Sequence, residues 1–239
     1  MNTSLPIVMA LLPLLDWLAV VVFFAGWSGY AWFARREAHA HQNSILAATN
    51  RIRRQWMLQV TYREVRVIDG VVVQNLSTSP SFFASTTILI IGGLLAALGA
   101  SEKATELVRE IPFAVRTSVL VFDLKLLLLT VIFVYAFFRF TWSLRQYTFG
   151  ALLVASAPEA RAFESDEALS REAFADRAGR VVGMAAETFN DGLRAYYMAF
   201  AAVGWFFSPL IFMGATAGVI YVLYQREFRS EVLQALRGS

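Results

Sequence analysis

The sequence of 239 residues contains no cysteine, and only 16% of its residues are charged. Without cysteine the chain can form no disulfide, no thiolate nucleophile and no Cys-ligated zinc or iron–sulfur site. Soluble domains have roughly a quarter of their residues charged and about half apolar, whereas 57% of this chain is hydrophobic. Because long uncharged runs carry the excess, we expect these segments to lie in lipid.

Catalytic and metal-binding motifs are also missing. The sequence has no GxSxG, HExxH or P-loop pattern. Its two histidines, His39 and His41, are spaced i, i+2 and therefore do not converge on one face of a helix. We predict that the chain is not an enzyme and that it has no catalytic residues, no cofactor and no metal site.

Four apolar stretches are long enough to cross a bilayer, because a hydrocarbon core about 30 Å thick needs about 20 helical residues. We predict an all-α integral membrane protein that forms a single domain over residues 1–239, with cytoplasmic helical extensions. The four predicted transmembrane helices cover about residues 11–34, 82–100, 119–138 and 195–224. Pro209 falls near the middle of the last helix, where it would introduce a kink and act as a hinge.

The distribution of arginine predicts the orientation in a bacterial inner membrane. Segments 35–79 and 139–194 hold seven Arg each, so the positive-inside rule places both in the cytoplasm. With four spans, both termini then lie outside, although Arg226, Arg229 and Arg237 make the C-terminal tail basic. A missed re-entrant segment is the alternative. Topology thus explains the net charge of +3 without a nucleic-acid partner.

Ionisable residues inside the predicted spans are the first candidates for function, because each is costly in lipid. Asp16 lies in the first span, and Asp123 and Lys125 lie in the third. Asp123 and Lys125 are two residues apart and point to different sides of their helix. At least one must reach another helix or subunit, and Asp16 can pair with Lys125. These charges either line an ion or proton path or form a structural pair.

A second polar group lies at the predicted cytoplasmic mouth. Arg139 and Arg145 lie at the inner end of the third span. Helical spacing places four further residues on one face near the start of the fourth span, namely Glu187, Asn190, Asp191 and Arg194. We expect a charge network between the two helices, which gates a pore, binds lipid phosphate or only fixes the angle between the helices.

A basic amphipathic helix is predicted after the first span, at the level of the lipid headgroups. Three arginines there precede a tryptophan and a short apolar run. The candidate headgroup contacts are Arg51, Arg53, Arg54, Trp56, Arg63 and Arg66. The alternative is that these residues only anchor the end of the first span.

Small residues mark predicted packing faces. Gly92 and Gly99 are seven residues apart in the second span, and Gly214 and Gly218 form a GxxxG pattern in the fourth. Such faces let helix backbones approach closely, either within one subunit or between subunits. Direct lining of a narrow pore is the third possibility.

Four stretches of the sequence are distinctive: SFFASTTILIIGGLLAALGA at residues 81–100, and residues 54–69, 122–145 and 187–230. Together they resemble a bacterial and plant family of uncharacterised multi-pass membrane proteins, a domain of unknown function. The resemblance covers most of the chain from residue 54 to residue 230. It implies a four-span architecture and brings no activity. The family has His-Pro where this chain has Ser208-Pro209, so the resemblance assigns no general role to a histidine there. The residues that carry the resemblance include Trp56, Arg63, Arg66, Asp69, Asp123, Lys125, Trp142, Arg145, Glu187, Asn190, Gly192 and Arg194.

Three functions therefore remain open. The first is a homo-oligomeric channel or transporter lined by helices that carry Asp123, Lys125 and Arg194. The second is a non-catalytic accessory or scaffold subunit of a larger membrane complex. The third is a lipid-binding or lipid-active protein that uses the arginines of the basic helix. The expected partners are membrane lipids and either a second copy of the chain or another membrane protein.

Overall fold

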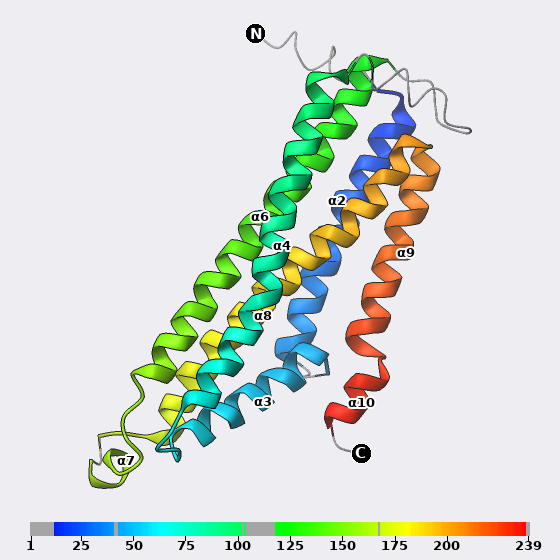
Figure 1. The fold of residues 1–239 in the computed structure, drawn as a ribbon. Helices are drawn as coiled ribbons and strands as arrows, with labels where there is room; N and C mark the ends of the chain where they lie inside the picture. The colour runs from blue at the N-terminus through cyan, green and yellow to red at the C-terminus, as the bar shows by residue number, and fades with distance from the viewer. Residues whose placement is uncertain (1–11, 41–42, 102, 104–117, 167, 238–239) are drawn as a thin grey trace, which may run out of the picture. The chain divides into compact units, whose positions relative to one another are not determined.

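The computed structural model describes residues 12–40, 43–101, 103, 118–166 and 168–237. Within these ranges every regular element is helical, which confirms the predicted all-α fold. The helices are α2 (Leu14–Ala40), α3 (Ile45–Val60), α4 (Val67–Gly99), α6 (Val119–Ala155), α7 (Ala162–Ser165), α8 (Arg171–Val203), the 3-10 turn η1 (Gly204–Phe206), α9 (Pro209–Phe228) and α10 (Glu231–Arg237) (Figure 1).

Three of the described helices are long and apolar enough to cross a membrane. They cover Leu14–Glu37, Val67–Gly99 and Val119–Ala155. This finding supports the predicted class of helical membrane protein, with three candidate spans in place of the four predicted.

The second candidate span begins earlier than predicted. We assigned residues 67–79 to a cytoplasmic segment, but they form the first part of α4, and Pro80 lies inside this helix. A proline lacks the N–H that would bond four residues back, so it removes one hydrogen bond from the ladder. Val73 and Ala84 are buried on either side of Pro80, and this packing holds the helix together across the missing bond.

The predicted fourth span is not one helix. The range 195–224 contains the end of α8, the turn η1 and most of α9. Ser208 caps α9, since its Oγ accepts a hydrogen bond from the backbone N–H of Ile211 at 3.0 Å. Pro209 is then the first residue of a helix, a position where its missing N–H would have no helical partner anyway. The predicted kink within a helix is therefore a break between two helices.

The chain divides into two compact units, and the single membrane domain over residues 1–239 stays a prediction. Unit 1 comprises Met1–Arg36, Thr87–Tyr135 and Arg194–Gln225, and unit 2 comprises Glu37–Thr86, Ala136–Leu193 and Arg226–Ser239. Helices α2, α4, α6, α8 and α9 each contribute residues to both units. The boundary therefore runs through helices and not through a flexible linker.

Each unit has its own buried core. In unit 1, Phe212 of α9 packs against Phe23 of α2, with ring centroids 5.0 Å apart, and stacks on Trp205 at 5.4 Å. In unit 2, buried side chains of four helices form one cluster that includes Met57 of α3 and Phe174 of α8. The same cluster also contains Val73, Tyr147, Val154, Ala178 and Val182.

Candidate functional site

Trp205, in the turn between α8 and α9, joins two of the predicted intramembrane charges. Its indole Nε1 donates a hydrogen bond of 2.6 Å to the carboxylate of Asp16, which is buried on α2. Its backbone carbonyl accepts a hydrogen bond of 2.8 Å from Nζ of Lys125, which is buried on α6. Asp16 and Lys125 thus meet at one residue of unit 1, and both fix the turn that reverses the chain.

The other charges of unit 1 are placed differently. Asp123 is half-buried on α6, and its Oδ1 has no hydrogen-bond partner among the described residues. Arg194 is buried on α8, with its guanidinium carbon 5.8 Å from the centre of the Tyr30 ring. These two residues therefore do not join the contacts made by Trp205.

Two residues of the predicted charge network at the cytoplasmic mouth form an ion pair in unit 2. Arg139 of α6 binds the carboxylate of Asp191 on α8, and Asp191 is buried. Glu187 and Asn190 are half-buried on α8, whereas Arg145 is exposed on α6. Next to the pair, the ring of Phe140 lies where a side chain at Gly192 would project, so Gly192 allows α6 and α8 to approach.

Two glycines bring α3 against α8 in unit 2. A Cβ added at Gly179 would lie 3.0 Å from the backbone Cα of Arg54, and one added at Gly183 would lie 2.9 Å from Oδ1 of Asn50. Only glycine gives the α3 backbone this close approach. The contact fixes the orientation of α3. Arg53 lies on this helix, one turn after Asn50.

A groove between α3 and α4 in unit 2 gathers three of the predicted headgroup contacts. We call it the α3–α4 groove, and its volume is about 410 Å³. It is lined by Thr49, Ile52, Arg53, Trp56, Arg63, Ile68, Asp69, Val72 and Leu76. Arg63 lies in the connection between the two helices. The spacing of the other lining residues places them on one face of each helix. The groove therefore combines an apolar wall with two guanidinium groups.

Arg53 is a cation without an acidic partner in the described chain. Its Nη1 donates hydrogen bonds of 2.9 Å to Thr49 and 2.8 Å to Asn50, both of which are neutral. Burial lowers the pKa of Arg53, and the nearby phenol of Tyr147 offsets only part of this effect. A guanidinium stays protonated in proteins, so the free-energy cost of partly removing Arg53 from water is not offset by an acidic side chain among the described residues.

Asp69 supplies the negative charge of the α3–α4 groove. It is fully buried in the first turn of α4, and its Oδ1 accepts hydrogen bonds from Trp56 at 2.7 Å and from Arg63. Its Oδ2 is buried and has no partner in the described ranges. Leaving a buried acceptor without a donor costs about 1–3 kcal/mol. Oδ2 can accept one more hydrogen bond, and such a bond would remove this cost.

The remaining predicted headgroup contacts lie outside the groove. Arg54 pairs with Asp176 on the surface, and this pair lowers the pKa of Asp176. Arg66 donates hydrogen bonds to the carbonyl oxygens of Ala157 and Pro158, so its guanidinium stabilises the connection between α6 and α7. Arg51 is exposed on α3. The side chains of His39 and His41 fall outside the described residues.

The predicted small-residue faces are open in the described structure. A Cβ added at Gly92, Gly99, Gly214 or Gly218 would meet no atom within 4 Å. These glycines therefore do not serve packing among the described parts of one chain. By contrast, a Cβ at Gly26 of α2 would lie 2.8 Å from Ile220 of α9.

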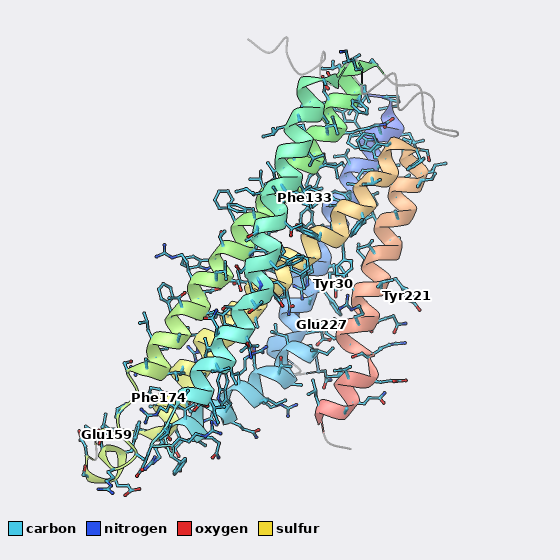
Figure 2. All side chains as sticks on the ribbon, in the orientation of Figure 1. Tyr30, Phe133, Glu159, Phe174, Tyr221 and Glu227 are labelled. Carbon is cyan, nitrogen blue, oxygen red and sulfur yellow. The ribbon has the colours of Figure 1, made fainter. Side chains whose placement is uncertain are left out.

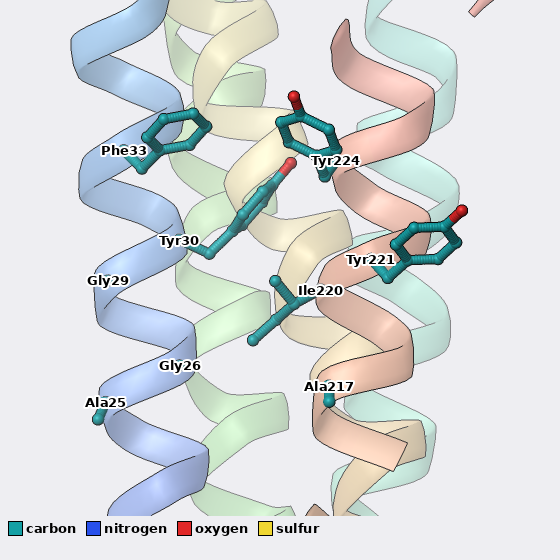
Figure 3. Close-up of a pocket in the computed structure, with 9 residues that line it drawn as sticks. All are labelled: Ala25, Gly26, Gly29, Tyr30, Phe33, Ala217, Ile220, Tyr221 and Tyr224. Carbon is teal, nitrogen blue, oxygen red and sulfur yellow. The ribbon is translucent and has the colours of Figure 1, made fainter. Parts of the chain in front are cut away.

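An apolar groove of about 680 Å³ lies between α2 and α9 within unit 1 (Figure 3). Gly26 and Gly29 contribute no side chain to the α2 wall of the groove, and Ile220 projects from the α9 wall (Figure 3). Tyr30 and Tyr224 approach one another at one end, whereas Tyr221 points away from the groove (Figure 3). The lining carries no charged side chain, so an apolar chain fits it and an ion does not.

Sequence reasoning missed the roles of Trp205 and Asp69. Trp205 lies 189 positions from Asp16, and no local pattern connects two residues at that distance. Asp69 appeared only as a residue shared with the resembling family, although an acidic residue in the first turn of a helix is itself a helix-start signal. The glycines at 179 and 183, four residues apart, were a readable sign of a tight helix contact.

These observations define a class of protein first: a helical membrane protein with buried interhelical charges and a basic groove on its second unit. The chain belongs to the family described as "Protein of unknown function, DUF599", which matches residues 18–232. No curated protein and no solved structure matches the chain. The family brings no activity with it, so a functional argument must start from the α3–α4 groove.

Proposed function

We propose that this protein binds anionic phospholipids through the α3–α4 groove at the cytoplasmic face of the membrane. The observation that carries the proposal is Arg53, a half-buried guanidinium that lines the groove without a carboxylate partner in the described chain. A lipid phosphate supplies the missing negative charge, and charge-assisted hydrogen bonds to guanidinium are among the strongest that proteins make.

The apolar part of the groove suits the rest of a lipid. Ile52, Ile68 and Val72 line it and are exposed to 44%, 73% and 36% of their surface. Soluble ligands such as free phosphate would leave this surface in contact with water. An acyl chain or glycerol backbone covers it, and burial of apolar area contributes about 25 cal/mol per Å².

We infer a membrane topology that differs from the predicted one. Helix α10 packs against α3, and the carboxylate of Glu227, which is labelled in Figure 2, accepts a hydrogen bond of 3.2 Å from the backbone N–H of Leu46 in the first turn of α3. The basic C-terminal tail then lies on the same side as the basic 35–79 segment, as the positive-inside rule prefers. Five passages would give this result with the N-terminus outside, namely the three candidate spans in α2, α4 and α6 and two further passages by α8 and α9.

An accessory or self-associating subunit is a second candidate. The open glycine faces of α4 and α9 support it, because such faces otherwise serve close helix contacts in membranes. A homo-oligomeric channel or transporter has less support. Asp16, Lys125 and Asp191 each bind groups of their own chain, and this use of charge needs no ion path.

Binding of phospholipid by the purified full-length protein tests the proposal. Phosphatidylglycerol at about 100 times its Kd should stabilise the protein by about 2.7 kcal/mol, and phosphatidylcholine should have little effect. Arg53→Gln removes the unpaired charge and should weaken phosphatidylglycerol binding by tenfold or more, since hydrogen bonds to charged groups contribute about 1.5–3 kcal/mol.

Arg51→Gln is the matched control, because it removes the same charge from an exposed position on the same helix. Native mass spectrometry and thermal unfolding in mild detergent measure the two effects. Equal loss of binding in both variants would reduce the site to general surface attraction. Unchanged binding of phosphatidylglycerol by Arg53→Gln would contradict the proposal.

A further inference from the structure

We infer that the lipid held in the α3–α4 groove is a phosphodiester with a single net negative charge and a hydroxyl group on its headgroup, the chemistry of phosphatidylglycerol. This inference rests on the proposed function and narrows it from anionic phospholipids to one class. Two independent features of the groove carry it: the balance of charge among the lining residues, and the buried oxygen of Asp69 that lacks a donor.

The charge balance sets how many negative charges the ligand brings. Arg53, Arg63 and Asp69 are the charged lining residues, so two cations and one carboxylate leave one net positive charge. A phosphodiester with one negative charge neutralises it. A phosphomonoester such as phosphatidic acid carries up to two, and the second would face Asp69 in a partly apolar groove, where like charges repel strongly.

The carboxylate of Asp69 sets what else the headgroup carries. Trp56 and Arg63 both bind Oδ1, and Oδ2 is the buried acceptor without a partner among the described residues. A headgroup hydroxyl is a neutral donor that satisfies such an oxygen without adding charge to the groove. An ammonium group, as in phosphatidylethanolamine, also donates but cancels the negative charge that Arg53 requires.

Arg63 gives the headgroup access to Asp69. Its side chain is 44% exposed, whereas that of Asp69 is 1% exposed. When a phosphate enters, Arg63 exchanges Oδ1 for the phosphate and opens access to the carboxylate, so that a headgroup hydroxyl donates to Oδ2 while Trp56 still donates to Oδ1. The exchange keeps Asp69 hydrogen-bonded throughout, which a buried charge requires.

The test compares lipids that differ by one feature, with the full-length protein in mild detergent and native mass spectrometry as the readout. Phosphatidylglycerol and phosphatidylmethanol have the same charge, but only the first carries headgroup hydroxyls. We expect phosphatidylglycerol to bind about tenfold tighter, as a hydrogen bond to a buried carboxylate implies. Phosphatidic acid and phosphatidylethanolamine should both bind more weakly than phosphatidylglycerol.

Asp69→Asn supplies the second measurement. It retains an oxygen for Trp56 but replaces the free carboxylate oxygen by an amide, so the preference for phosphatidylglycerol over phosphatidylmethanol should fall to about one. Should this variant fail to fold, the ratio between the two lipids in the unaltered protein still decides. An equal affinity for both lipids, above that of phosphatidylcholine, overturns this inference and leaves the proposed function standing. If neither lipid binds more tightly than phosphatidylcholine, the proposed function itself is contradicted.

Discussion

Trp17 and Trp205 of unit 1 each bury an indole N–H, but only one of the two has a hydrogen-bond acceptor in the described chain. The Nε1 of Trp205 donates to the buried carboxylate of Asp16, whereas the Nε1 of Trp17 is buried and has no partner in the described chain. Loss of the first N–H leaves a buried carboxylate oxygen without its donor, and loss of the second leaves nothing unsatisfied. At this scale Asp16 and Lys125 hold the turn between α8 and α9.

We therefore predict that Trp205→Phe lowers the free energy of unfolding by about 1.5–3 kcal/mol. Phenylalanine keeps the ring that stacks on Phe212 but cannot donate to Asp16. Trp17→Phe is the control and should have an effect below about 1 kcal/mol, since no hydrogen bond is lost. Thermal unfolding in detergent measures both variants. Equal losses would mean that ring volume matters and the hydrogen bond does not.

Helices α8 and α9 use glycine in opposite ways. Gly179 of α8 faces the backbone of Arg54, so α3 packs on it without any intervening side chain. Gly214 of α9 has open space on its Cβ side. The first glycine is required by packing between two elements of one chain. The second is free for contact with another chain, which is where the second candidate function would have its interface.

Alanine substitution at these two glycines separates the roles. Gly179→Ala should destabilise the protein, because the clash at 3.0 Å is with the α3 backbone and not with a movable side-chain end. Gly214→Ala should leave the monomer as stable or raise its stability by up to about 1 kcal/mol through helix propensity. Thermal unfolding measures stability, and cross-linking in native membranes measures assembly. Loss of a cross-linked species in Gly214→Ala alone would favour the accessory-subunit function, and unchanged assembly would count against it.

At the scale of the whole molecule, the connections between helices alternate between the two units. Segments 41–66 and 156–170 and the C-terminal α10 belong to unit 2, whereas the turn at 204–208 belongs to unit 1. A chain that crosses a membrane repeatedly alternates its connections in the same way. Under the five-passage topology that we propose, the arginine-rich connections and the basic tail would all lie on one side of the membrane, and this would account for the basic tail.

Reporter fusions test this topology in a bacterial host. We expect green fluorescent protein fused after Arg237 to fluoresce, because it folds in the cytoplasm. Alkaline phosphatase inserted at Ser208 should be active, because it folds outside. A fusion after Asp69 is the internal control and should behave like the one after Arg237. Active phosphatase at the C-terminus would restore an even number of passages and remove the cytoplasmic tail.

Sequence alone determined the class of protein, because apolar run length and arginine bias are local properties set by the thickness and the charge asymmetry of a membrane. It also indicated the arginines of α3 as headgroup contacts. It could not separate Arg53, which has no acidic partner among the described residues, from Arg54, which pairs with Asp176 at a distance of 122 positions in the sequence. Nor could it separate Pro209 as a kink from Pro209 as a helix start, since the capping of α9 depends on local geometry at Ser208. The tertiary structure decided these points, because whether a charge is paired, buried or open to a ligand depends on which distant segments pack beside it.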